Sequence, residues 1–209
     1  YMVSWFCERF AGVNAREFGL DLSTEQILET AAARVGPGAG GLFAVPYWNN
    51  ALMPYWDFDA RGVMVGWTGA HGKAHAYRAI LEGIAFEQRL MTEGAEGALE
   101  KPVEHILAMG GGSRSPLWCQ IIADVMRRPV SVTREAESTC LGAGMLAAAA
   151  CGIHGGIREA AAAMSGTGDR FEPDEGRAAR YDRLYGVYKE IYPSLRPLFP
   201  KLKDALSEG

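Results

Sequence analysis

Apolar residues recur at helical spacing in several segments of the chain. The segment up to about Phe18 and the long segment Gly72–Glu93 both have an apolar face and a polar face. Ser23 and Gln26 have the spacing of a capping box, which predicts a helix that continues to about Val35. Further helices are expected over Pro116–Arg127, from near Thr139, over Ile157–Met164 and through the tyrosine-rich C-terminal segment.

Short apolar runs next to turn residues predict strands. Leu42–Val45 follows the glycine-rich breaker Gly36–Gly41, and Val103–Met109 leads into three more glycines. Val130–Thr133 is the third predicted strand. Between the first strand and the long helix, Pro46–Gly69 is rich in aromatic and turn residues and is expected to be a loop. With no linker evident, the pattern predicts one α/β domain.

Two of the expected helices are unusually apolar. The uncharged run Thr139–Ile153 is rich in Ala and Gly. It is shorter than the ~18 apolar residues of a membrane span, so we expect a buried core helix and no membrane partner. The C-terminal helix carries an apolar stripe, which we expect to pack in the core rather than bind a ligand. Its members are Tyr181, Leu184, Tyr185, Tyr188, Ile191 and Tyr192.

Composition narrows the classes of function. The chain has 209 residues, of which 48% are hydrophobic, and its net charge is −4, which excludes intrinsic disorder. Lys and Arg number 21 against 25 Asp and Glu, without a basic run, so we expect no nucleic-acid partner. The four cysteines form no C-x-x-C pair, which favours reduced thiols in a cytoplasmic protein. Glycine is in excess, with 26 residues, where about 7% is usual.

The most informative glycines follow the strand Val103–Met109. Gly110, Gly111 and Gly112 come directly after it, and Ser115 is placed to cap the next helix. Backbone N–H groups and the positive end of a helix dipole would meet there, and a residue without Cβ lets a flat base or a phosphate approach the backbone. A tight turn explains the same glycines. Neither G-x-G-x-x-G nor a Walker A loop is present, so the residues alone leave both interpretations open.

Other candidate residues have structural explanations. His71 and His75 stand four apart, but the glutamate of a metalloprotease helix is absent, so we expect capping or surface roles rather than a zinc site. Asp57 and Asp59 lie in the aromatic loop and are expected to form turns. No serine has the G-x-S-x-G setting of a hydrolase nucleophile.

Four segments, in order, resemble the C-terminal domain of the FGGY carbohydrate kinases. They are Pro46–Asp57 with Ala60–Gly62, Arg78–Phe86, Gly110–Asp124 and Glu137–Gly144. The resemblance implies an actin-like, ribonuclease-H-like ATPase domain, an α/β fold with a twisted sheet flanked by helices, over residues 1–209. It also implies that Gly111 and Ser115 contact the nucleotide, and that Gly110 and Gly112 shape the turn. Relatives often have asparagine where Ser115 stands.

The same resemblance implies a function. An intact kinase of this type would use ATP and Mg²⁺ to phosphorylate a hydroxyl of a sugar or polyol. Its N-terminal domain is absent from this chain, and the catalytic aspartate is expected upstream of Tyr1. We therefore assign no catalytic and no metal-binding residue here. The expected partners are the substrate, that N-terminal domain and, in a homodimer, a second copy of the chain.

The sugar and the class of activity have alternatives. D-xylulose is the favoured substrate, because the motif from Gly110 to Trp118 has the Gly-Gly-Gly-Ser-x-Ser-Pro-x-Trp form. Asn50–Pro54 lacks the charged pair that relatives often carry there, so ribulose, glycerol and other polyols stay open. A non-catalytic actin-like nucleotide switch would share the fold. A dinucleotide-dependent oxidoreductase is the second rival, and the missing G-x-G-x-x-G argues against it.

Overall fold

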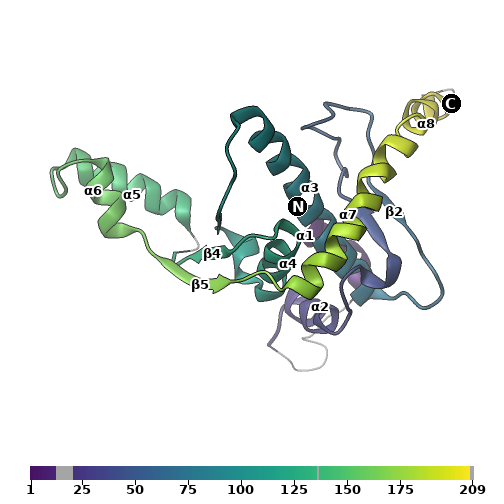
Figure 1. Cartoon of the computed structure of the whole chain (residues 1–209), viewed down its shortest axis with the longest axis horizontal. Helices are drawn as coiled ribbons and strands as arrows, with labels where there is room; N and C mark the ends of the chain where they lie inside the picture. Colours follow the sequence, from purple (N-terminus) through teal and green to yellow (C-terminus); the bar gives the residue numbers. More distant parts are fainter. Residues whose placement is uncertain (13–20, 136, 208–209) are drawn as a thin grey trace. The chain divides into compact units, whose positions relative to one another are not determined.

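The structure, a computed structural model, describes residues 1–12, 21–135 and 137–207 (Figure 1). It divides into two compact units. The first unit comprises Tyr1–Pro102 together with Glu175–Gly209, and the second unit comprises Val103–Asp174. The sequence predicts a single domain with no linker, whereas in the structure the middle third of the chain forms a unit of its own.

The first unit contains most of the helices. Its elements in chain order are α1 (Met2–Phe6), the π-helical turn η1 (Cys7–Ala11), α2 (Thr24–Ala33), the 3₁₀ turn η3 (Ala39–Gly41), β1 (Phe43–Val45), β2 (Val63–Val65), α3 (Lys73–Leu99), α7 (Glu175–Leu195) and α8 (Leu198–Ser207). The capping box at α2 is confirmed, because Ser23 and Gln26 exchange backbone and side-chain hydrogen bonds of 2.8 and 3.2 Å. The expected continuation of the first helix to Phe18 lies outside the described residues.

The strand β2 lies in the segment that the sequence predicts to be a loop. It pairs antiparallel with β1, with Ala44 opposite Met64. Helix α3 packs against this ribbon at Gly83, where a Cβ atom would overlap the carbonyl oxygen of Ala44. Glycine at this position therefore sets the distance between the helix and the ribbon.

The tyrosine stripe of α7 packs in the core of the first unit, as predicted. Each of four buried tyrosines also donates its hydroxyl hydrogen to a carboxylate, a partner that the stripe does not reveal. The pairs are Tyr181 with Glu82 at 2.7 Å, Tyr185 with Glu93 at 2.8 Å, Tyr188 with Glu87 at 2.6 Å and Tyr192 with Asp57 at 2.6 Å. Carboxylates thus satisfy these buried hydroxyl groups, and two of the carboxylates, Glu82 and Glu87, are themselves buried.

The second unit is built on a three-stranded sheet. Its elements are β3 (Ile106–Ala108), the 3₁₀ turn η4 (Gly111–Arg114), α4 (Pro116–Met126), β4 (Val130–Thr133), α5 (Ser138–Ala150), α6 (Ile157–Met164) and β5 (Thr167–Phe171). The strand order is β3-β4-β5, parallel between β3 and β4 and antiparallel between β4 and β5. Cys119 and Ala123 of α4 pack with Val130 to form the core of this unit, which fixes α4 relative to the end of β3.

The prediction that Thr139–Ile153 forms a buried core helix is wrong. Helix α5 lies beside α6 (Figure 1), and among its described residues only Ala148 is buried. Leu146 is 63% exposed. Small side chains make a helix look apolar in sequence but give it little area to bury. In the described ranges, no helix is both long and apolar enough to cross a membrane.

Candidate functional site

The glycine turn at the end of β3 has a fixed shape. Gly110 has a φ of +77°, a backbone region that favours glycine. Its carbonyl oxygen accepts hydrogen bonds from the backbone N–H of Ser113 at 3.2 Å and from the Ser113 hydroxyl at 2.7 Å. Both bonds lie within the turn and close it, and the Ser113 side chain that makes one of them is buried.

Gly111 is the open position of the turn. It is exposed, and a Cβ atom built on it would meet nothing within 4 Å. Within the described residues, the backbone N–H groups of Gly111 and Gly112 have no hydrogen-bond acceptor. Two neighbouring donors without an acceptor form a surface that an external acceptor can approach closely.

Gly112 has a structural reason to be glycine. A Cβ atom there would lie 2.6 Å from the ring of Trp118, so this residue lets the indole pack on the backbone. The Trp118 Nε1–H is buried and lacks a hydrogen-bond partner in the described part of the chain. The three glycines thus serve three purposes: Gly110 permits the turn, Gly112 makes room for Trp118, and Gly111 leaves the backbone accessible.

Ser115 begins helix α4 as predicted. Its Oγ accepts a hydrogen bond from the backbone N–H of Trp118 at 3.1 Å, and Pro116 occupies the first helical position. The positive end of the α4 dipole therefore lies beside the glycine turn. The exposed Arg114 guanidinium lies at the same place and is paired with the Glu137 carboxylate at 3.4 Å, so the pair adds no net charge. Direct contact between Ser115 and a nucleotide stays a prediction.

This arrangement suits binding rather than catalysis. It offers backbone donors and a helix N-terminus, a combination that attracts anionic or hydrogen-bond-accepting ligands. Asp124 is a nearby carboxylate, but it is buried and its Oδ1 accepts hydrogen bonds from Gln120 and from the backbone of Asp174. Among the residues that the structure describes, no three metal-ligating side chains come together.

The other candidates have the structural roles that the sequence favours. His75 Nδ1 accepts the backbone N–H of Gly72 at 3.2 Å and so caps α3. His71 Nδ1 accepts the N–H of Thr68 at 2.9 Å. Asp57 accepts the N–H of Asp59 at 3.0 Å, which confirms the turn. Asp57 also pairs with Arg196 at 3.1 Å and Asp59 with Lys203 at 2.7 Å, which sequence reasoning missed.

The Arg78–Phe86 segment owes its pattern to packing. Arg78 and Glu82 form a buried ion pair at 2.7 Å, although their spacing alone is also typical of an exposed pair. Burial raises the pKa of Glu82, and the Arg78 guanidinium opposes this effect. The apolar residues on both sides of the pair were the signal that could have revealed its burial.

Comparison with known proteins finds one matching family and several relatives. The sequence profile described as "FGGY family of carbohydrate kinases, C-terminal domain" matches residues 2–151. The Bacillus subtilis proteins xylulose kinase and gluconokinase are 32% and 31% identical to the chain over 98% and 97% of its length. The chain spans only 39% and 40% of the length of these two relatives.

Solved structures have the same fold. Xylulose kinase from Rhodospirillum rubrum matches with a TM-score of 0.78 and 30% identity, over 94% of this chain and 38% of that one. Ligand-bound xylulose kinase from Lactobacillus acidophilus matches with a TM-score of 0.78 and 27% identity, over 96% and 39%. The α/β, actin-like and ribonuclease-H-like fold expected from the sequence is therefore confirmed.

Proposed function

Because the chain belongs to the FGGY family of carbohydrate kinases, we propose that it is the nucleotide-binding, C-terminal part of an ATP-dependent sugar or polyol kinase. The relatives are more than twice as long as the chain. In this proposal, an N-terminal domain precedes residue 1 and carries the catalytic base. Residues 1–209 supply the nucleotide side of the enzyme.

The observation that carries the proposal is the open backbone at Gly111. Its exposure and the unpaired N–H groups of Gly111 and Gly112 suit a nucleotide that lies flat against the backbone and accepts hydrogen bonds. The positive end of the α4 dipole favours a ligand with negative charge. Gly110 and Gly112 would hold the shape of this nucleotide site, and Ser115 would contact the nucleotide beside Gly111.

The reaction would transfer the γ-phosphoryl group of ATP in line to a substrate hydroxyl. This chain would bind and orient the nucleotide, and closure of the two domains would exclude water. Mg²⁺ would neutralise the phosphate charge when bound. The described residues bring no three possible ligands together, so we assign no residue of this chain to the ion.

We propose D-xylulose as the substrate. Xylulose kinases are among the relatives and among the solved structures that the chain resembles. Gluconokinase and glycerol kinase are among the relatives as well, so gluconate and glycerol, together with ribulose, form the test panel. We also propose that the enzyme is cytoplasmic, because its four cysteines are free thiols. The assembly that we propose to test is a homodimer.

Calorimetric titration tests the nucleotide proposal. The 209-residue chain should bind ADP saturably and should not respond to NAD. Saturable NAD binding without ADP binding would contradict the proposal and favour the oxidoreductase alternative.

Turnover tests the kinase proposal. The chain alone should show no sugar-dependent ATP hydrolysis or phosphorylation, because it lacks the catalytic base. A longer protein that includes the N-terminal domain should phosphorylate D-xylulose faster than the other members of the panel. A longer protein that binds ADP but phosphorylates none of them would favour the nucleotide switch.

A further inference from the structure

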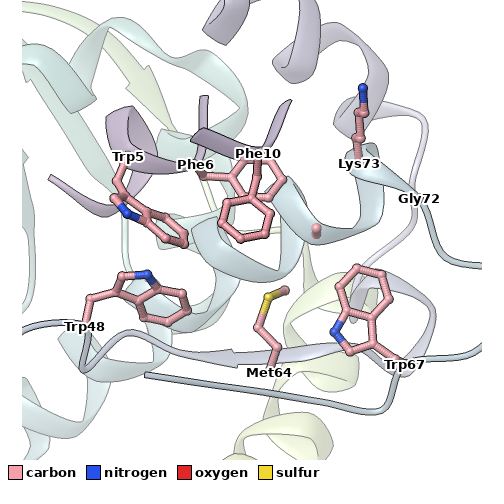
Figure 2. Close-up of a pocket in the computed structure, with 9 residues that line it drawn as sticks. Trp5, Phe6, Phe10, Trp48, Met64, Trp67, Gly72 and Lys73 are labelled. Carbon is pink, nitrogen blue, oxygen red and sulfur yellow. The ribbon is translucent and has the colours of Figure 1, made fainter. Parts of the chain in front are cut away.

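The first unit contains an aromatic pocket, and none of the residues assigned to the proposed nucleotide site (Gly110–Gly112 and Ser115) lines it. Its volume is about 340 Å³, within the range of small ligand sites. Figure 2 shows aromatic and thioether side chains on opposite sides of this cavity. The side chains that dominate its lining are Trp5, Phe6, Phe10, Trp48, Met64 and Trp67.

The walls of this aromatic pocket come from four segments. Trp5 and Phe10 belong to α1 and η1, within the first eleven residues, and their rings are 4.9 Å apart. Trp5 also meets Trp48, which follows β1, edge-on at 5.3 Å. Met64 of β2 and Trp67, together with the start of α3, complete the cavity. Large rings from separate segments are thus held around a space that none of them fills.

Part of this aromatic surface is exposed, although Phe6 is buried. Phe10 is 63% exposed and Trp67 is 51% exposed. Among the described residues of the lining, Lys73 alone is charged, and Figure 2 shows its ammonium group pointing away from the rings. Contiguous exposed apolar surface of this kind marks an interaction site. The described residues of the lining provide no convergent polar groups of the kind that fix the orientation of a small polar ligand, so an apolar segment of polypeptide suits the pocket better.

We infer that the aromatic pocket receives apolar side chains of the polypeptide that leads into α1 in the longer kinase. This inference rests on the proposed function. The chain matches a C-terminal domain and covers about two fifths of its relatives, so most of the remaining polypeptide in those relatives precedes the matched part. Tyr1 and Trp5 are one helical turn apart, joined by a backbone hydrogen bond of 2.8 Å. The preceding residues therefore enter the first unit beside the pocket wall.

Fluorine NMR on 5-fluorotryptophan-labelled protein tests this inference. Two proteins are compared: the 209-residue chain, and the same chain preceded by the N-terminal part of Bacillus subtilis xylulose kinase up to its matched segment. The signals of Trp5, Trp48 and Trp67 should shift and lose their solvent isotope effect in the extended protein. Trp56, which is 61% exposed and does not line the pocket, should keep its solvent isotope effect. Unchanged pocket signals in a folded extended protein would overturn the inference.

A pair of charge substitutions gives an independent readout. Trp67→Lys places a charge in the pocket, whereas Val65→Lys places it on β2 outside the pocket lining, and both positions are exposed enough to tolerate lysine in the 209-residue chain. Trp67→Lys should lower the melting temperature of the extended protein by about 5 °C and leave that of the 209-residue chain nearly unchanged. Val65→Lys should lower neither. Equal effects of Trp67→Lys on both proteins, or no effect on either, would contradict the inference.

Two further outcomes would also overturn the inference that the aromatic pocket receives the polypeptide leading into α1. Pocket signals that change with the concentration of the 209-residue chain would identify a second copy as the occupant. If the extended protein does not fold, the N-terminal part is added as a separate chain, and absence of a saturable change at the pocket tryptophans counts against the inference.

Turnover measured on the same samples separates the two proposals. Shifted pocket signals without turnover would contradict the kinase proposal alone. Turnover with unshifted signals would contradict the pocket inference alone.

Discussion

Tyr181 donates its hydroxyl hydrogen to Oε1 of Glu82 at 2.7 Å, between residues 99 positions apart in the sequence. Arg78 Nε donates to the same oxygen at 2.7 Å, and the backbone N–H of Gly38 lies 3.0 and 3.1 Å from the two carboxylate oxygens. One buried carboxylate therefore joins α3, α7 and the glycine-rich breaker before β1. Burial raises the pKa of Glu82 while these donors favour its ionised form.

Removing the Tyr181 hydroxyl tests how much its hydrogen bond to Glu82 contributes to the free energy of unfolding. Tyr181→Phe should destabilise the first unit by about 2 kcal/mol, because a buried charged acceptor loses a donor. Tyr185→Phe is the matched control, since its hydroxyl donates to Glu93, which is only partly buried. The control should lose less than about 1 kcal/mol. Urea unfolding measures both, and equal losses would contradict the role assigned to Glu82.

Two glycines of α3 should respond in opposite directions to alanine. Gly83→Ala should destabilise the protein by about 2 kcal/mol or more, because the added methyl group overlaps the carbonyl of Ala44. Gly94→Ala should stabilise it by up to about 1 kcal/mol, because a Cβ there meets nothing within 4 Å and alanine has the higher helix propensity. Thermal unfolding measures both changes. A neutral Gly83→Ala would show that the helix and ribbon are not in this contact.

Asp57 should make stability depend on acid pH. The hydrogen bond from Tyr192, followed by those from the Asp59 backbone and Arg196, lowers the pKa of Asp57 below its ordinary 3.8. Because the pKa is lower in the folded state, the stabilisation is complete above the unfolded value of 3.8 and is lost as the pH falls through the folded value.

Melting temperatures measured from pH 6 to pH 2 check this dependence. The difference between the native chain and Asp57→Asn should be largest above pH 5 and should shrink below 3.8. In the Tyr192→Phe background, which lacks the hydrogen bond that contributes most to lowering the pKa of Asp57, the same difference should be smaller. A difference that persists at the lowest pH would contradict the assignment.

The four thiols should fall into two classes. Cys7 and Cys119 are buried, whereas Cys140 and Cys151 are exposed. Burial raises the pKa of Cys7 to about 11, so little reactive thiolate forms at neutral pH. A disulfide-exchange reagent should modify two thiols in the folded chain and four after unfolding. Cys140→Ser should lower the fast count by one and Cys7→Ser should not, and rapid reaction of Cys7 would place it outside the core.

Local features of the fold were predictable from the sequence. The cap at Ser23 and the cap at Ser115 depend on residues three positions away, and both form as expected. The strand β2 was missed because its pairing with β1 is decided across an intervening loop. Helix α5 was misjudged because burial depends on what packs against a helix, and an alanine-rich run says little about that.

The candidate site was predictable in position but not in detail. The sequence locates the glycine turn between a strand and a helix, and that arrangement is confirmed. It does not say that Gly112 accommodates Trp118 or that Gly110 requires a positive φ, because these facts depend on the ring position and the backbone path. The Arg78–Glu82 pair shows the same limit, since its third partner, Tyr181, comes from α7.

Nucleotide binding at the exposed backbone of Gly111 is tested most directly by calorimetric titration of ADP into three proteins: the native chain, Gly111→Val and Gly142→Val. At both positions a Cβ meets nothing within 4 Å and the backbone is not in the positive-φ region, so both variants should fold. Gly111→Val should weaken ADP binding at least tenfold, or about 1.4 kcal/mol, because the valine side chain covers the exposed backbone. Gly142→Val should bind ADP like the native chain. An ADP affinity of Gly111→Val equal to that of the native chain would contradict nucleotide binding at Gly111.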